Sequence, residues 1–115
     1  MSAEEFLSRA SKTKAKQSQL REAEGIEQPF CRYAETKGCK ALKLIYLRKK
    51  GFPDRTVICP GARVFFIEFK KPRGTLAPAQ VMVRKLLESF GFEYYLCDQP
   101  GQAEKILEDF LASSS

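Results

Sequence analysis

Residues 51–70 read GFPDRTVICPGARVFFIEFK, and this stretch decides the fold because two short apolar runs flank a Pro-Gly turn. The short connection predicts an antiparallel hairpin. A Pro-Asp pair directly precedes the first run, and Glu68 and Lys70 lie near the end of the second. Successive side chains of a strand point to opposite faces, so Glu68 and Lys70 should share one face. The same pattern also fits an ordinary hairpin with charged residues at one end. The neighbouring sequence has to distinguish a functional site from such a hairpin.

The sequence on both sides of the hairpin predicts an α/β domain with the element order α-β-β-β-α-β-α. The expected elements are helices at 26–37, 78–90 and 102–111 and strands at 41–47, 55–59, 64–70 and 92–97. Pro29 is tolerated only in a first helical turn, so the first helix should begin near Glu27 or kink there. A strand-helix-strand unit crosses right-handed and parallel, which makes the sheet mixed and the domain three-layered. Residues 1–25 are expected to be an N-terminal extension of the domain at 26–115.

Length and composition limit the classes of protein. With 115 residues and a hydrophobic fraction of 43%, the chain suits one compact domain. No apolar run reaches the roughly 18 residues that span a bilayer, and the start has no signal-peptide pattern, so we expect a soluble cytoplasmic protein. Four scattered cysteines without a CxxC pair and without histidine argue against a zinc site. Reduced, buried cysteines are favoured over a pairwise disulfide.

The charge is positive and uneven. The net charge is +6, and the segment 32–73 holds twelve Lys or Arg residues against three acids. A positive field around a few acids suits a polyanionic partner together with a metal ion, and nucleic acid is favoured over a surface that is merely basic. The absence of histidine excludes a histidine general base and leaves carboxylates, lysine and metal for hydrolytic chemistry.

The hairpin supplies the groups that metal-assisted phosphodiester hydrolysis needs. Bound Mg²⁺ or Mn²⁺ stabilises charge on the phosphoryl oxygens and lowers the pKa of water. Mg²⁺ keeps several waters and needs only a few protein oxygens, which Asp54, Glu68 and the backbone carbonyl of Phe69 can provide. Lys70, on the same face as Glu68, can hold the attacking water or stabilise the developing charge.

Residues outside the hairpin complete the candidate site. Glu27, at the edge of the first helix, is a third carboxylate that would touch the metal directly or through water, although the helix dipole also explains an acid there. Gln80, in the first turn of the next helix, can orient the water or the scissile phosphate, unless it is a simple helix-start residue. That helix should bury Val83, Leu86, Leu87 and Phe90. The residues expected to grip the nucleic-acid backbone are Arg48, Lys49, Lys50, Lys71 and Arg73, although the first three also suit a solvated loop.

The pattern GFPDR, followed by PGARVFFIEFKKPRGTLAPAQ, resembles the VRR-NUC nucleases. This branch of the PD-(D/E)xK superfamily includes single small domains of phages and bacteria and the catalytic domain of the Fanconi-anaemia-associated nuclease. The resemblance covers about Ile26 to Cys97 and includes the G-x-PD, the ExK and the downstream Gln. It implies a restriction-endonuclease-like core and a homodimer in the cytoplasm of a bacterial or phage-infected cell. The roles it implies are metal ligation by Asp54 and Glu68, catalysis by Lys70, support by Gln80 and a first-helix carboxylate at Glu27.

These patterns predict a Mg²⁺- or Mn²⁺-dependent endonuclease that hydrolyses DNA phosphodiester bonds with little sequence specificity. A two-fold protein matches a two-fold substrate, so branched DNA such as four-way junctions or flaps is the expected substrate. One alternative is a basic nucleic-acid-binding module that keeps the fold and does not cut. Another is the nuclease subunit of a larger restriction or repair complex.

Overall fold

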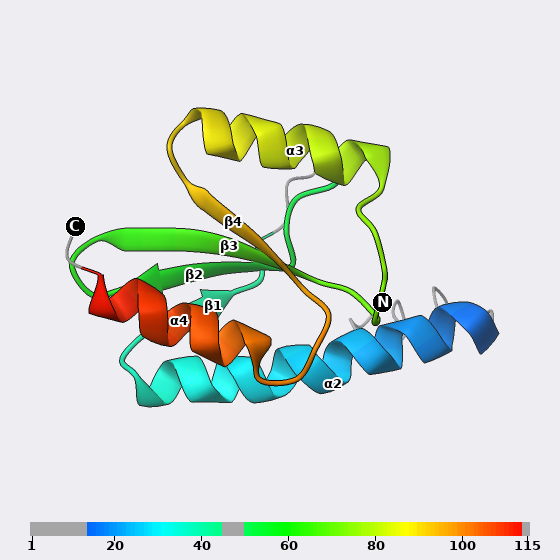
Figure 1. Cartoon of the computed structure of the whole chain (residues 1–115), viewed down its shortest axis with the longest axis horizontal. Coiled ribbons are helices and arrows are strands. Elements are labelled where there is room, and N and C mark those ends of the chain that lie inside the picture. Colours follow the sequence, from blue (N-terminus) through cyan, green and yellow to red (C-terminus); the bar gives the residue numbers. More distant parts are fainter. Residues whose placement is uncertain (1–13, 45–49, 114–115) are drawn as a thin grey trace, which may run out of the picture.

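The structure is a computed structural model that describes residues 14–44 and 50–113, with side chains from residue 23 onward. Its elements are α2 (Lys14–Thr36), β1 (Lys40–Leu42), β2 (Arg55–Cys59), β3 (Arg63–Phe69), α3 (Pro78–Ser89), β4 (Glu93–Cys97) and α4 (Gln102–Ala112) (Figure 1). This order agrees with the predicted α-β-β-β-α-β-α order. Within the described ranges, no helix is long and apolar enough to cross a membrane.

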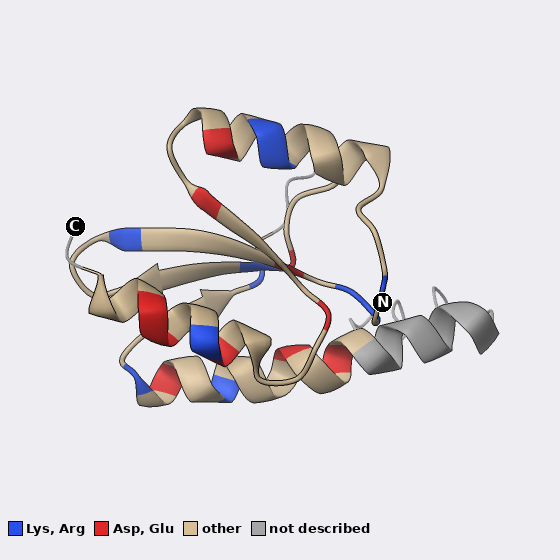
Figure 2. Ribbon diagram, in the orientation of Figure 1, with Lys and Arg blue, Asp and Glu red and all other residues tan. Residues whose placement is uncertain are grey.

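The strands form one mixed sheet in the order β1-β2-β3-β4. β1 and β2 pair antiparallel, as do β2 and β3, whereas β3 and β4 pair parallel. Helix α3 covers one face of the sheet, and α2 and α4 cover the other (Figure 1). The predicted three-layer α/β domain with a mixed sheet is therefore confirmed. Acidic and basic residues meet where β2 begins and β3 ends (Figure 2).

The main core lies between the sheet and the layer formed by α2 and α4. Phe65 of β3 packs on Phe110 of α4, with 4.6 Å between ring centroids, and Phe69 packs on Phe30 of α2 at 6.0 Å. All four side chains are buried. Burial of one such side chain is worth roughly 1.5–3 kcal/mol. The alternation of β3 then sends Glu68 to the opposite face, as the sequence predicted.

The α3 side of the sheet has a smaller apolar layer. Phe66 packs edge-on against Phe52, which precedes β2, and against Phe92, which precedes β4, with ring centroids 5.8 and 5.3 Å apart. Val83 is the residue of α3 that reaches this layer, and it is buried. The hydrogen bond from Gln80 of α3 to Glu68, at 3.0 Å, places this helix over the end of the sheet where Glu68 lies.

The first helix is longer than predicted, because it begins at Lys14 and continues through Pro29. Pro29 has no N–H to donate to the carbonyl of Gly25, four residues earlier. Gly25 is exposed, so water can bond that carbonyl. The burial of Ile26 and Phe30 in the core holds the chain helical on both sides of the proline. Helix α2 is thus continuous across the predicted boundary between the extension and the domain.

Strand β1 is shorter than predicted and ends at Leu42, which pairs with Thr56. The partner strand β2 begins at Arg55, and the preceding Pro53 has no N–H to donate to a ladder. The register would place Lys43 opposite Arg55, so β1 could extend along β2 by only one more residue. Part of the strand predicted at 41–47 also lies outside the described residues.

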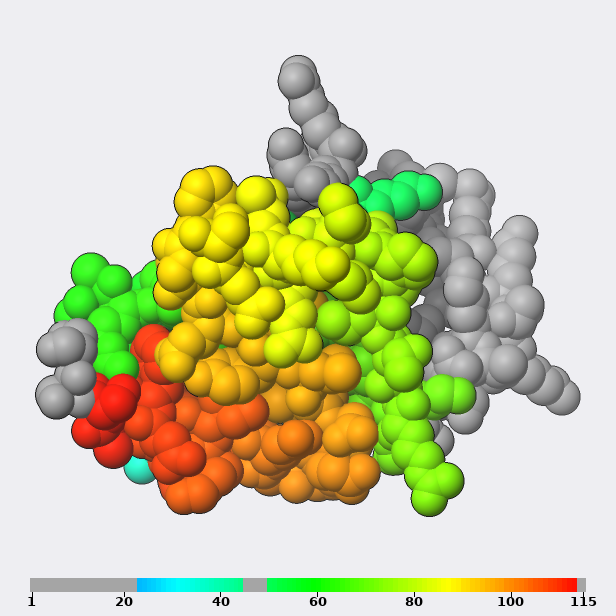
Figure 3. Space-filling model, turned by 45° about the horizontal axis from the view of Figure 1, so that its top comes forward, coloured from blue at the N-terminus to red at the C-terminus, as the bar shows by residue number. Residues whose placement is uncertain are grey.

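The outer side of α3 is more apolar than predicted. Leu86 and Phe90, both predicted to be buried, are 43% and 72% exposed, and Met82 is 59% exposed. The prediction was wrong because α3 is the only described helix on its side of the sheet, so it buries little more than the row that contains Val83. Figure 3 shows α3, in yellow-green, forming a broad part of the molecular surface.

Candidate active site

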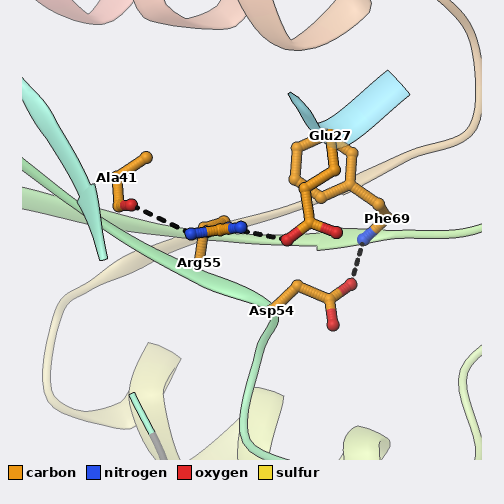
Figure 4. A network of polar contacts seen from close by, with 5 residues as sticks. All are labelled: Glu27, Ala41, Asp54, Arg55 and Phe69. Carbon is orange, nitrogen blue, oxygen red and sulfur yellow. Dashed lines mark hydrogen bonds and ion pairs between the residues drawn. The ribbon is translucent and has the colours of Figure 1, made fainter. Parts of the chain in front are cut away.

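Asp54 directly precedes β2 and lies beside the end of β3; we call this place, where β2 begins and β3 ends, the strand mouth. The register pairs Arg55 with Ile67, which brings Asp54 level with the last residues of β3. The backbone N–H of Phe69 donates a 2.9 Å hydrogen bond to Asp54 Oδ2 (Figure 4). The N–H and C=O of one strand residue point to the same neighbour, so the carbonyl of Phe69 also faces the Asp54 side. The sequence-predicted oxygens of Asp54 and Phe69 are therefore brought together.

Glu68 is the most buried acid of the site, with 3% of the residue exposed. Its Oε2 accepts a 3.0 Å hydrogen bond from Gln80 Nε2 and lies 3.6 Å from Lys70 Nζ. Its Oε1 is buried and has no hydrogen-bond partner. An unpaired buried carboxylate oxygen is costly, so this atom is suited to receive a cation, a water or a proton.

The electrostatics around Glu68 also favour a cation. Burial raises the pKa of Glu68 to about 8, and the charge of Asp54 adds to the increase. The ammonium of Lys70 lowers this pKa and offsets only part of the effect. Two carboxylates side by side in a largely enclosed place favour a shared proton or a positive ion.

Lys70 follows the last residue of β3 and continues the ladder, since its N–H donates to the carbonyl of Cys97 at 2.9 Å. Its side chain is 24% exposed and its ammonium pairs with Glu68. The two side chains therefore lie on one face, as the sequence predicted. An ammonium in this position can donate hydrogen bonds to a water or a phosphate oxygen at the mouth of the site.

Gln80 links the start of α3 to Glu68. While Nε2 donates to the carboxylate, Oε1 accepts from the backbone N–H of Ala77 at 2.8 Å. This second contact is one half of a capping box, and Ala77 has no side-chain acceptor for the other half. Gln80 is thus a helix-start residue and a direct neighbour of Glu68 at once. Its predicted contact with water or phosphate stays a prediction.

Gly51 brings the loop before β2 against the first turn of α3. Its φ is +94°, and a Cβ there would stand 2.6 Å from the carbonyl carbon of Ala79 and 2.8 Å from the nitrogen of Gln80. Only glycine combines this backbone conformation with such a close approach. The glycine of the G-x-PD pattern therefore holds the loop that leads to Asp54 next to the helix that carries Gln80.

Glu27 is held by Arg55 on the other side of the strand mouth (Figure 4). Arg55 Nε donates to Glu27 Oε2 at 2.6 Å, and Arg55 Nη1 donates to the carbonyl of Ala41 at 3.2 Å. Burial raises the pKa of Glu27, the hydrogen bond from Arg55 lowers it, and the charge of Asp54 raises it again. Glu27 lies well inside α2, so a helix dipole does not explain this acid. The ion pair with Arg55 explains why an acid stands at this position.

The donor set fits a divalent cation held by few protein atoms. Within the described side chains, no three His, Cys, Asp or Glu residues gather closely enough to hold a metal ion. Asp54 and Glu68 form a pair, whereas Glu27 is engaged by Arg55. Two carboxylates, a backbone carbonyl and water suit Mg²⁺, which binds oxygen and retains several waters. A contact of Glu27 with the metal through water agrees better with its ion pair than direct ligation does.

The predicted phosphate-contacting residues are only partly described. Lys50 and Arg73 are exposed and Lys71 is half-buried. Lys71 and Arg73 belong to the segment that joins β3 to α3, which carries basic residues at the strand mouth (Figure 2). The N–H of Arg73 donates to Asp98 Oδ2 at 3.1 Å, which ties this segment to the end of β4. Arg48 and Lys49 lie outside the described residues.

Sequence reasoning missed the role of Arg55. The residue directly follows Asp54, so the strand period of two places the two side chains on opposite faces. The face of Arg55 is the one that packs on α2, where an unpaired charge would be costly. A single charged residue on a strand face that is otherwise buried indicates that an oppositely charged side chain lies nearby. The acid of the first helix, Glu27, could have been predicted as the partner of Arg55 on this ground.

These features define a class of fold, in which a mixed four-stranded sheet brings a Pro-Asp and a Glu-x-Lys together beneath a helix. A solved structure described as a VRR_NUC domain has a similar overall fold, with a TM-score of 0.71 and 22% sequence identity over 77% of this chain and 97% of that chain. No family model and no curated protein matches the sequence. The chain therefore has the fold of a VRR-NUC domain, as its motifs predicted.

Proposed function

We propose that this chain is a metal-dependent endonuclease that hydrolyses DNA phosphodiester bonds. The observation that carries the proposal is the buried carboxylate of Glu68, whose Oε1 has no hydrogen-bond partner and which lies beside Asp54 and Lys70. Mg²⁺ or Mn²⁺ held by Asp54, Glu68 and the carbonyl of Phe69 would stabilise charge on the phosphoryl oxygens and lower the pKa of water. The VRR_NUC fold and the net charge of +6 support DNA as the substrate.

The remaining site residues have distinct tasks in this proposal. Lys70 donates from its ammonium to the attacking water or to the phosphate that gains charge. Gln80 fixes the orientation of Glu68 through the 3.0 Å hydrogen bond to Oε2, which leaves Oε1 free. Glu27, held by Arg55, contacts a water of the site. A carboxylate that is oriented by a neighbour loses less entropy when it binds a cation.

The substrate is expected to be recognised by shape rather than by base sequence. Lys50, Lys71 and Arg73, together with Arg48 and Lys49, would contact phosphates, and phosphate contacts carry no direct sequence information. Branched DNA, such as a four-way junction or a flap, would place phosphates on several sides of a small basic domain. This selectivity rests on the resemblance and on the proposed homodimer.

The proposed homodimer would use the outer side of α3. Met82, Leu86 and Phe90 are exposed at spacings of four residues, and Phe92 next to them is 39% exposed. An apolar stripe on one helix is self-complementary across a two-fold axis, which is the usual symmetry of dimers. Leu86→Glu should therefore lower the solution mass from dimer to monomer in light scattering. Lys85→Glu, at an exposed neighbouring position, is the matched control and should leave the dimer intact.

Cleavage assays on defined substrates test the proposal. Four-way junctions, flaps, nicked duplexes and supercoiled plasmid are incubated with Mg²⁺, Mn²⁺ or a chelator. Asp54→Asn, Glu68→Gln and Lys70→Met should each abolish metal-dependent cleavage, while DNA binding measured by anisotropy persists. Lys105→Met, which removes an exposed ammonium on α4, is the matched control. Binding without cleavage by the unaltered protein on every substrate would favour the non-cleaving binding module.

A further inference from the structure

Two of the four cysteines face each other at one end of the β1–β2 pair. The antiparallel register joins Lys40 to Ile58 and Ala41 to Val57. One residue further along, the same register places Cys39 opposite Cys59. Both side chains belong to the core on the α2 side of the sheet, and they are 1% and 3% exposed. Directly opposed residues of antiparallel strands have their Cα atoms about 4.5–5.5 Å apart, which lies within the range that a disulfide spans.

The thiols of this pair influence each other. Burial is the main cause that raises the pKa of Cys59, to about 12, and the neighbouring thiol of Cys39 adds to the increase. Cys39 Sγ in turn lies 3.8 Å from the carbonyl of Lys37, to which it can donate. The N–H of Cys39 donates to the carbonyl of Ala34 and is therefore not used in a ladder bond to Cys59. Side chains stand closer in pairs that lack such ladder bonds.

The other cysteines have different surroundings. Cys31 is half-buried on α2, and Cys97 is buried at the end of β4, where the register pairs it with Phe69. The neighbours that perturb the thiols of Cys31 and Cys97 are charged residues and include no cysteine. Cys39 and Cys59 are thus the pair that the register singles out.

We propose that Cys39 and Cys59 form a site of reversible disulfide formation, with a small-molecule disulfide such as oxidised glutathione as the oxidant. One thiolate attacks the oxidant and releases one glutathione thiol, which leaves a mixed disulfide on the protein. The second cysteine then attacks the protein sulfur of that mixed disulfide and releases the second glutathione thiol. The pair loses two electrons and two protons, and one oxidant disulfide becomes two thiols.

The location of the pair decides how it reacts. Both thiols are buried and the pKa of Cys59 is raised, so reaction requires local opening and should be slow near neutral pH. β1 has only three residues and is an edge strand of the sheet, which makes its opening less costly than that of the central strands. Cys59 ends β2, whereas Asp54 precedes its start, and five residues of strand separate them by about 16 Å. The bond should therefore leave the candidate active site intact.

The expected consequence is a more stable protein. A disulfide between these positions closes a loop of roughly 20 residues in the unfolded chain, and the loss of chain entropy should raise the melting temperature by roughly 10 °C. The inference does not depend on the proposed nuclease activity. It concerns a different end of the sheet and a different chemistry.

Peptide mapping of the native protein tests the site. The full chain is incubated with oxidised glutathione at pH 8.5, alkylated and digested with trypsin without reduction. The expected product is residues 38–40 linked to residues 56–63, with a melting temperature above that of the reduced protein and full reversal by dithiothreitol. Cys59→Ala should abolish the linkage and the gain in melting temperature, whereas Cys31→Ser, the matched control, should keep both.

Three results would overturn the inference. The first is a native protein in which Cys39 and Cys59 remain alkylated as free thiols after prolonged oxidation. The second is a linkage that involves Cys31 or Cys97 instead. The third is a Cys39–Cys59 linkage that lowers the melting temperature, because the native geometry would then not accommodate the bond. Mapping of the unaltered protein gives the first two answers even if a cysteine variant fails to fold.

Discussion

Replacing Arg55 by methionine tests how much its ion pair with Glu27 contributes to the free energy of unfolding. The substitution keeps an apolar stem and removes the guanidinium. The side chains of Arg55 and Glu27 are 14% and 9% exposed and their charged atoms are 2.6 Å apart, so solvent screens the pair weakly. Removing one partner of a buried ion pair costs about 3–5 kcal/mol. The carbonyl of Ala41 also loses a donor, at a further cost of about 1 kcal/mol. We therefore expect Arg55→Met to lower the free energy of unfolding by about 5 kcal/mol.

A double-mutant cycle separates the pair from its surroundings. Urea denaturation at pH 7 is followed for Arg55→Met, Glu27→Met and the double variant. Two apolar side chains in place of a buried ion pair are often neutral or stabilising, so the double variant should recover most of the loss, with a coupling of at least about 2 kcal/mol. Arg63→Met, which removes a guanidinium bonded to the carbonyl of Phe110 and not to an acid, should be additive with Glu27→Met. Additive losses for Arg55 and Glu27 would refute the reasoning.

The remaining predictions concern Glu68 and the elements that hold it. Because the pKa of Glu68 is raised from 4.5 to about 8, the folded protein keeps a proton that the unfolded chain releases. Without metal, the free energy of unfolding should fall as pH rises from about 5 to 8, and Glu68→Gln should flatten that slope in urea titrations. Gly51 and Gly91 have similar φ values, +94° and +92°, but a Cβ at Gly51 would stand 2.6 Å from Ala79, whereas a Cβ at Gly91 would meet open space. Gly51→Ala should therefore lower the free energy of unfolding by at least about 1 kcal/mol more than Gly91→Ala does. Gln80→Leu should weaken Mn²⁺ binding in calorimetry by about tenfold while melting stays cooperative.

The hairpin could be predicted from the sequence because its information is local. The bounds of β2 agree with the prediction, and β3 is displaced by one residue. The alternation of apolar side chains fixed the face of Glu68, and the ion pair with Lys70 follows from it. Strand period and turn chemistry act over a few residues, so neither depends on the rest of the fold.

The long first helix and the partner of Glu27 could not be predicted in the same way. The rule that excludes proline from helices competes with the burial of Ile26 and Phe30, and a single sequence does not say which is stronger. The contact between Glu27 and Arg55 joins positions 28 residues apart, one on a helix and one on a strand. It exists only because α2 crosses the mouth of β2, which is a property of the tertiary fold.

The charges at the strand mouth explain why a metal would be needed in a protein that is already basic. When ionised, Glu27, Asp54 and Glu68 contribute three negative charges against the two positive charges of Arg55 and Lys70, a balance of −1. A site with that balance repels a phosphate, although the net charge of the whole chain is +6. A divalent cation changes the balance to +1 and also supplies the partner that Glu68 Oε1 lacks. We therefore expect the basic surface to bind DNA with or without metal, and a phosphate to approach Lys70 and Glu68 more readily when the cation is bound.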